Sequence, residues 1–161
     1  MKRSFGRSHA PYAPDGTEMT IEPAARTRDW QHPMPLRFRD LDYLGHVTAA
    51  QYLAMFEEAR AAWLSVRFDT PYPTYVVARQ EIDFDRELRM HDGPVTVTIE
   101  LVRIGARSLD ISERLESRDA TLHARSRATL VLWNARTRRS RDLTEPERTT
   151  LEHGRADGRR P

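Results

Sequence analysis

TAAQYLAMFEEARAAWLSV, residues 48–66, is the stretch that decides the fold, because nothing else in the chain looks so helical. Apolar side chains recur along it at three- and four-residue steps, at Tyr52, Phe56, Ala59 and Trp63. That spacing places them on one face of an α-helix, for which Thr48 is a suitable N-cap residue. A helix of this length extends about 28 Å, so its apolar face can support a sheet.

Segments of strand length lie on both sides of this helix. Apolar and polar residues alternate, or apolar residues gather in short runs, at residues 31–40, 75–84, 95–99, 108–115 and 122–133. A short C-terminal helix is expected at residues 144–152. Short connections favour antiparallel neighbours. The sequence therefore predicts an α+β fold in which the sheet wraps around the long helix, with an exposed edge that invites pairing with a second subunit.

The composition is that of one globular domain. The chain has 161 residues, of which 39% are apolar and 31% charged. We expect residues 29–152 to fold as the domain, residues 1–28 to be a disordered leader and residues 153–161 to be a flexible tail. The chain has no cysteine, which excludes disulfides and thiolate nucleophiles. No apolar run approaches the roughly 20 residues that span a bilayer, so no membrane partner and a cytoplasmic location are expected.

The charge distribution argues against a nucleic-acid partner. The net charge is +2, and residues 1–29 contribute +1 while residues 153–161 contribute +2, so the part between them has a net charge of −1. A folded part without excess positive charge does not attract a polyanion. The histidines are too widely separated for a metal site, and no glycine-rich phosphate loop is present. We therefore expect neither a metal nor a cofactor.

The residues suited to chemistry are concentrated in RDLDYLGHV, residues 39–47. A carboxylate just before a helix lies near backbone N–H groups without helical acceptors, and such groups can bind an oxyanion. Together they suffice for acyl transfer, with the carboxylate as nucleophile or as the base that activates water. Spacing alone nevertheless favours capping and turn formation for Asp40 and Asp42, and packing or hydrogen bonding for His46.

A family resemblance changes this balance. RFRDLDYLGHV at residues 37–47, followed by Tyr52-Leu53 and by FEEAR at residues 56–60, resembles the signature of hotdog-fold acyl-CoA thioesterases of the 4-hydroxybenzoyl-CoA thioesterase type. The similarity extends to about Glu152. It implies a five-stranded antiparallel sheet around one long helix and hydrolysis of an acyl-CoA to a free acid and CoA. It also implies a homodimer or homotetramer with active sites at the dimer interface.

The resemblance implies roles for five residues around the helix start. Asp42 matches the family's nucleophile or general base. Backbone N–H groups at Thr48 and Ala49 match the donors that polarise the thioester carbonyl. Gly45 and His46 match the Gly-His step that shapes the turn, where they would contact the substrate.

Further substrate contacts are expected outside this loop. Tyr52 is a candidate for lining an acyl tunnel, although sheet-facing core is its more ordinary role. For Glu57 the favoured role is a structural ion pair with Arg60 at a subunit contact, and a substrate contact or second catalytic acid is the alternative. Arg107 could meet a CoA phosphate or be a solvated turn residue. Ser108 ends a segment that in the family lies near the active-site mouth.

One departure from the family keeps a second function open. Many members have Asn-Asn where this chain has Thr48-Ala49, although the backbone donors survive that change. The alternative is a hotdog module that binds an acyl-CoA or an acyl-carrier protein without cleaving it. A hotdog dehydratase is a weaker third alternative, because no His and Asp pair has that group's spacing.

Overall fold

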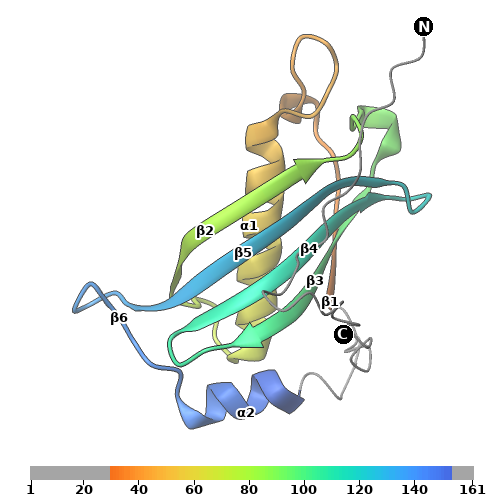
Figure 1. Ribbon diagram of the computed structural model, residues 1–161. Helices are drawn as coiled ribbons and strands as arrows, with labels where there is room; N and C mark the ends of the chain where they lie inside the picture. The colour runs from red at the N-terminus through yellow and green to blue at the C-terminus, as the bar shows by residue number, and fades with distance from the viewer. Residues whose placement is uncertain (1–29, 154–161) are drawn as a thin grey trace, which may run out of the picture.

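The computed structural model describes residues 30–153, in which a curled antiparallel sheet packs against one long helix (Figure 1). The strands are β1 (Trp30–Met34), β2 (Tyr75–Phe84), β3 (Val95–Ile104), β4 (Ser108–Ser117), β5 (Leu122–Asn134) and β6 (Arg139–Ser140). The helices are α1 (Ala49–Arg67) and α2 (Glu145–His153), with short 3-10 turns η1 (Phe38–Asp40) and η2 (Met90–Asp92). The sheet order is β1-β3-β4-β5-β2, and β6 pairs antiparallel with the end of β5. The predicted α+β hotdog architecture is thereby confirmed.

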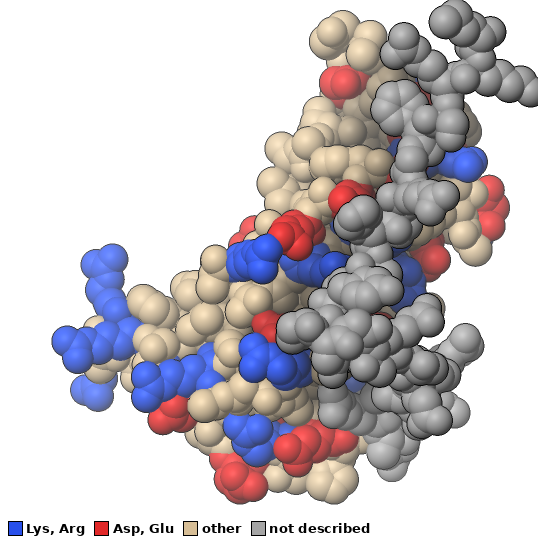
Figure 2. Space-filling model, viewed as in Figure 1, with Lys and Arg blue, Asp and Glu red and all other residues tan. Residues whose placement is uncertain are grey.

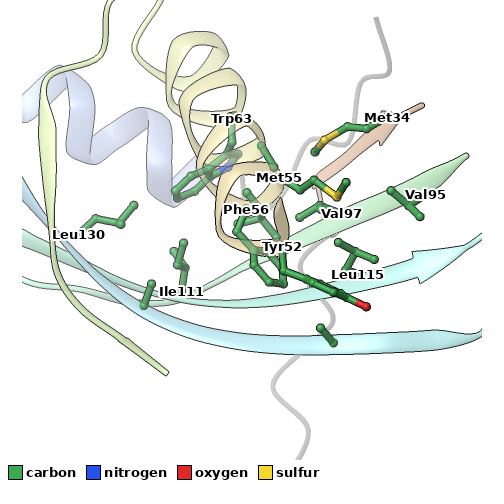
Figure 3. Close-up of a cluster of buried hydrophobic side chains, with 14 of the residues drawn as sticks. Met34, Tyr52, Met55, Phe56, Trp63, Val95, Val97, Ile111, Leu115 and Leu130 are labelled. Atoms are coloured by element: carbon green, nitrogen blue, oxygen red, sulfur yellow. The ribbon is translucent and has the colours of Figure 1, made fainter. Parts of the chain in front are cut away.

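The long helix α1 forms where its pattern predicts. Thr48 is the N-cap residue, and its side-chain oxygen accepts a hydrogen bond from the N–H of Gln51. The four residues of the apolar face are buried: Tyr52, Phe56, Ala59 and Trp63. Figure 3 shows the three aromatic rings of this face together with the strand side chains of the core. Burying a large apolar side chain contributes about 1.5–3 kcal/mol, so this face holds the helix on the sheet.

The interface between helix and sheet also contains a buried ion pair. Glu113 alternates on β4 with buried apolar residues, so its side chain points toward α1. The Arg60 guanidinium donates two hydrogen bonds to the Glu113 carboxylate, at 2.8 and 2.7 Å, and the two side chains are 1% and 0% exposed. Gln80 accepts a third hydrogen bond from Arg60 and in turn donates to Ser126. This polar network ties α1 to β4, β2 and β5.

The strand predicted over residues 31–40 is wrong in its second half, because β1 ends at Met34. The alternation continues to Leu36, which is buried, but Phe38 is 87% exposed. The Asp40 carboxylate accepts a hydrogen bond from the N–H of Arg37 at 2.7 Å, and the Asp40 N–H donates to the Arg37 carbonyl. This local turn replaces a sheet ladder, as aspartate often does.

Two loops meet at one end of the sheet, at the top of Figure 1. One is the segment of residues 41–47 that leads into α1, and the other is the segment of residues 85–94 between β2 and β3. The N–H of Val47 donates to the Leu88 carbonyl at 2.8 Å, which joins the two. The turn between β3 and β4 and the hairpin of β5 and β6 lie at the opposite end.

Charged side chains of both signs are intermixed on the face visible in Figure 2. Exposed pairs such as Arg103–Asp110 and Arg125–Asp85 alternate the two signs across the sheet. Within residues 30–153, no helix is long and apolar enough to cross a membrane. The predicted leader at residues 1–28 lies outside the described residues, as does the tail beyond His153, the last residue of α2.

Candidate active site

The loop before α1 is closed by its own hydrogen bonds. Leu41 and Val47 form an antiparallel bridge, and the N–H of Asp42 donates to the His46 carbonyl at 2.8 Å. The N–H of Gly45 donates to the Asp42 carbonyl at 3.0 Å. Gly45 has φ of 80°, which glycine adopts without the strain that a side chain adds. A tight turn therefore presents residues 42–46 next to the helix start.

The Asp42 carboxylate is held by this turn. Its Oδ1 accepts hydrogen bonds from the N–H of Leu44 at 2.8 Å and of His46 at 2.9 Å. The His46 N–H does most to lower the pKa of Asp42, burial opposes it, and the Leu44 N–H lowers the pKa further. Because its pKa is lowered, the Asp42 carboxylate is ionised at neutral pH. Because it is partly exposed, it is also open to solvent. Those are the properties of a nucleophile or a general base.

The neighbouring Asp40 has a structural role. It is 5% exposed, and its carboxylate accepts the Arg37 N–H described above. Its carbonyl accepts a hydrogen bond from the N–H of Thr48 at 3.1 Å. The turn-forming role that the pattern favoured for Asp40 is confirmed, and the role is local to the entry into α1.

The hydrogen bond between the Thr48 N–H and the Asp40 carbonyl determines which backbone N–H at the helix start is available to a substrate. The Thr48 N–H is already donated to Asp40, so it is not free to polarise a carbonyl. Within residues 30–153, the N–H of Ala49 has no hydrogen-bond acceptor, and Ala49 is exposed. First-turn N–H groups point toward the helix N-terminus and attract negative charge. Of the two predicted donors, Ala49 alone retains the free N–H that an oxyanion needs.

His46 is held by residues that the sequence did not point to. Its Nε2 lies 2.9 Å from a carboxylate oxygen of Glu87, and Arg89 binds the same carboxylate. The backbones of His46 and Arg89 form an isolated antiparallel bridge. Glu87 and Arg89 come from the other loop, more than 40 residues along the chain. No motif or spacing signals that contact, because it arises from the packing of two loops.

Tyr52 lies in the core. Its ring is 3% exposed and meets Phe84 of β2 edge-on, with the ring centroids 5.1 Å apart. Burial raises the pKa of Tyr52 to about 12, and the negative charge of Asp92 adds to the effect. The phenol is therefore neutral at any ordinary pH. In this chain the sheet-facing core role applies, and a tunnel contact for Tyr52 stays a prediction.

Glu57 lines a hollow that is separate from Asp42. The hollow has a volume of about 640 Å³ and lies between α1 and the start of β2, lined by Leu53, Glu57, Arg60, Pro73, Tyr75, Val76, Val77 and Gln80. The expected ion pair of Glu57 with Arg60 is wrong, because the guanidinium binds Glu113 and Gln80 instead. The exposed Glu57 carboxylate is thus left at the hollow, where its role as a substrate contact stays a prediction.

Arg107 and Ser108 lie far from Asp42 within one chain. Arg107 immediately precedes β4 and Ser108 is its first residue, whereas the other end of β4 reaches the loops of the candidate site. A ten-residue strand extends roughly 33 Å. Arg107 donates to Asp142 at 2.5 Å, which raises the pKa of Arg107 through that hydrogen bond. A single chain does not bring these two residues to Asp42, and their role as substrate contacts stays a prediction.

The described part of the chain offers no evident metal centre. Among residues 30–153, no three His, Asp or Glu side chains gather closely enough to hold an ion. The candidate site therefore consists of the ionised Asp42, the free Ala49 N–H and the His46 ring, all at the start of α1. This arrangement suits attack on a carbonyl carbon, with the developing oxyanion at the helix start.

Comparison with known proteins supports a related chemistry. Residues 36–150 match the sequence profile of the Thioesterase-like superfamily. A thioesterase from Thermus thermophilus, complexed with coenzyme A and Zn, superposes with a TM-score of 0.68 at 28% identity, over 79% of this chain and 95% of that one. A search of curated proteins found no significant match.

Two more distant structures show the same fold. A hypothetical protein from Staphylococcus aureus, in complex with CoA, has a TM-score of 0.70 at 19% identity, over 83% of this chain and 88% of that one. The structure of a predicted thioesterase from Bacillus stearothermophilus has a TM-score of 0.70 at 24% identity, over 78% and 96% of the two chains. With the profile match covering more than two thirds of its length, the chain belongs to the thioesterase-like superfamily.

Proposed function

We propose that this chain hydrolyses an acyl-CoA thioester to a free carboxylic acid and CoA, with Asp42 as the catalytic carboxylate. The observation that carries the proposal is an ionised Asp42, held by two backbone N–H groups on the turn that leads into α1, where the Ala49 N–H has no acceptor within residues 30–153. Membership of the thioesterase-like superfamily supports the reaction class. The resemblance to the 4-hydroxybenzoyl-CoA thioesterase type supports assigning the carboxylate role to Asp42.

The Asp42 carboxylate can act in two ways. As a nucleophile, an oxygen of Asp42 attacks the thioester carbonyl, CoA leaves as the thiolate, and water then hydrolyses the mixed anhydride. As a general base, Asp42 takes a proton from water, the hydroxyl adds to the carbonyl, and the proton goes to the departing thiolate. In both routes the Ala49 N–H stabilises the oxyanion.

A second subunit completes the proposal. The outer strand β2 has exposed apolar residues at Val76, Val77 and Phe84, and no strand of the described residues 30–153 pairs with its outer edge. Such an edge is suited to strand pairing with another copy of the chain. A homodimer formed there would cover the hollow beside Glu57 and could bring a partner's surface to each Asp42. Light scattering of the purified protein tests this, and a monomer at all concentrations contradicts it.

The decisive assay measures thiol release from short, long and aromatic acyl-CoAs. Replacing Asp42 by Asn keeps its size and removes its charge, so turnover should fall by at least about a hundredfold, the contribution of a positioned acid or base. Asp110→Asn is the matched control, because Asp110 is another carboxylate with a lowered pKa but pairs with Arg103 on the sheet. Equal activity of wild type and Asp42→Asn would refute the role of Asp42.

One observation favours a non-catalytic alternative. Thr48 and Ala49 stand where many members of the resembled family have Asn-Asn, so the substrate meets no side-chain amide at these two positions. Under this alternative the chain binds acyl-CoA or an acyl-carrier protein without cleaving it. Calorimetric binding of CoA esters with no thiol release from any of them would establish the binding module, and multiple turnover would exclude it.

A further inference from the structure

The hairpin of β5 and β6 projects from the sheet and is strongly basic. Residues 134–141 contain four arginines and no acid, and one of the four, Arg141, binds Glu147. The other three are exposed, and we call them the arginine cluster: Arg136, Arg138 and Arg139. Within residues 30–153, no side chain of the cluster forms an ion pair or a hydrogen bond. Figure 2 shows basic side chains gathered on the projection at its left, where Figure 1 labels β6.

The turn that carries the cluster has a fixed shape. The Asn134 side chain accepts hydrogen bonds from the N–H groups of Arg136 and Thr137, both at 3.0 Å, and the Arg138 N–H donates to the Asn134 carbonyl at 2.8 Å. Arg138 has φ of 53°, a left-handed conformation in which glycine or asparagine is the ordinary residue. The backbone alone therefore gives no reason for an arginine at this position, and its charged side chain does.

Several exposed arginines outside the cluster bind carboxylates. Arg103 pairs with Asp110, and Arg107, which the sequence suggested as a phosphate contact, donates to Asp142. Their charges are thereby balanced within the chain. The charges of the cluster are not, so they are available to an anionic ligand. Guanidinium groups match phosphate oxygens with paired hydrogen bonds, which makes phosphate the group that the cluster suits best.

Acids next to the hairpin favour a small anion over a large one. Helix α2 follows the hairpin and has Glu145 and Glu147 in its first turn. An acidic protein surface that buries about 800 Å² of this chain would cover these carboxylates as well as the cluster, and a nucleic acid would also meet them. A CoA thioester concentrates its charge in a diphosphate and a ribose phosphate, at the far end of a long arm from the thioester. Such a ligand can occupy the cluster alone.

The position of the hairpin requires a second subunit. Within one chain it lies at the opposite end of the sheet from Asp42 (Figure 1). The start of β2 pairs with the end of β5, Tyr75 with Leu132, directly before the hairpin. In the homodimer proposed above, antiparallel pairing sets the start of one β2 beside the end of the other. The end of β2, at Phe84, leads into the loop that contacts the helix start. The partner subunit's hairpin thus comes to the end of the sheet that bears Asp42.

We propose that the arginine cluster of one subunit binds the phosphate groups of the CoA thioester whose acyl carbonyl lies at Asp42 of the partner subunit. The cluster determines specificity for CoA esters and does not touch the reacting carbonyl. This inference rests on the proposed hydrolysis and on the proposed homodimer.

The first test measures CoA binding by calorimetry and needs no turnover. The cluster variant has glutamine in place of all three arginines. A control variant removes the same charge from the outer face of the sheet by Arg103→Gln, Arg125→Gln and Arg127→Gln. CoA should bind the cluster variant about tenfold more weakly, the combined effect of three exposed charge pairs, and should bind the control as it binds the wild type. Equal affinities of wild type and cluster variant, or no binding of CoA by the wild type, overturn the inference.

The second test measures thiol release from an acyl-CoA and from the N-acetylcysteamine thioester of the same acid, which has no phosphate. With acyl-CoA the cluster variant should have a KM raised about tenfold and an unchanged kcat, whereas with the short thioester it should equal the wild type. An equal loss on both thioesters makes the hairpin merely structural, and a loss confined to acyl-carrier protein makes that protein the partner; each overturns the inference. If the wild type cleaves no thioester but binds CoA through the cluster, the proposed hydrolysis fails and the phosphate site stands.

Mixed dimers, purified through two different tags, test the contribution across subunits. An Asp42→Asn subunit paired with a cluster-variant subunit leaves the intact Asp42 facing an intact cluster, so the KM for acyl-CoA should be that of the wild type. With all of these substitutions in one subunit and none in the other, the intact Asp42 faces the altered cluster, so the KM should be raised. The same KM in both mixed dimers, or the reverse order, overturns the inference.

Discussion

The buried pair of Arg60 and Glu113 allows a quantitative prediction. Replacing Glu113 by Leu removes one partner and leaves the Arg60 guanidinium in a site where it is 1% exposed. Leaving such a charge without its partner costs about 3–5 kcal/mol. For a domain of this size, 1 kcal/mol corresponds to roughly 4 °C in Tm, so the variant should melt about 12–20 °C below the wild type.

The assay is thermal unfolding followed by circular dichroism, with all proteins at one concentration because oligomers unfold at concentration-dependent temperatures. The double variant Arg60→Met with Glu113→Leu should recover most of the loss, since apolar residues of similar volume often replace a buried pair without cost. Arg103→Met is the control for an exposed pair, in which the arginine is 65% exposed, and should cost less than about 1 kcal/mol. If Glu113→Leu costs no more than that control, the pair is not desolvated and the reasoning is refuted.

Three further predictions follow from single residues. The Thr98 hydroxyl is buried and has no hydrogen-bond partner within the described chain, so Thr98→Val should raise the free energy of unfolding by about 1 kcal/mol; a clear loss in urea unfolding would contradict this. Gly45→Ala should cost about 1 kcal/mol because of the positive φ, and Gly45→Asn less; equal costs would show that conformation is not the cause. Because the pKa of Asp42 is lowered in the folded state, its ionised carboxylate stabilises the fold at pH values above about 4, the ordinary pKa of an aspartate. That stabilisation is lost as the pH falls through the folded-state pKa of Asp42. A carboxyl titration of Asp42 by carbon-13 NMR with its midpoint above that value would contradict this.

The local pattern of the sequence determined most of the architecture. The three- and four-residue repeat over residues 48–66 located α1 with its Thr48 cap. The run at residues 75–84 is a strand with the predicted bounds. Both signals depend on neighbours in the chain, so periodicity reports them. The strand predicted to extend to Asp40 ends early, because the Asp40 carboxylate accepts a hydrogen bond from the Arg37 N–H in place of a neighbouring strand.

The candidate site, like the fold, was predicted in part from the sequence and in part required the structure. The family signature identified Asp42 and the helix start, since those residues are adjacent in the chain. Only the tertiary structure decided that Arg60 pairs with Glu113 rather than with Glu57, because a strand brings that carboxylate under the helix. It also decided that Glu87 holds the His46 ring, a contact between two loops.

The sequence by itself therefore determined the fold class, the order of the elements and the loop that bears the candidate carboxylate. Those features follow from short-range spacing and turn chemistry. Only the tertiary structure decided the partners of the charged side chains, the choice of Ala49 over Thr48 as the free donor within residues 30–153, and which strand, β2, forms an exposed edge of the kind that the sequence predicted. These three features have one physical cause. Each depends on which groups the folded chain brings within hydrogen-bonding distance or leaves in water, and the separation of two residues along the sequence does not determine their distance in space.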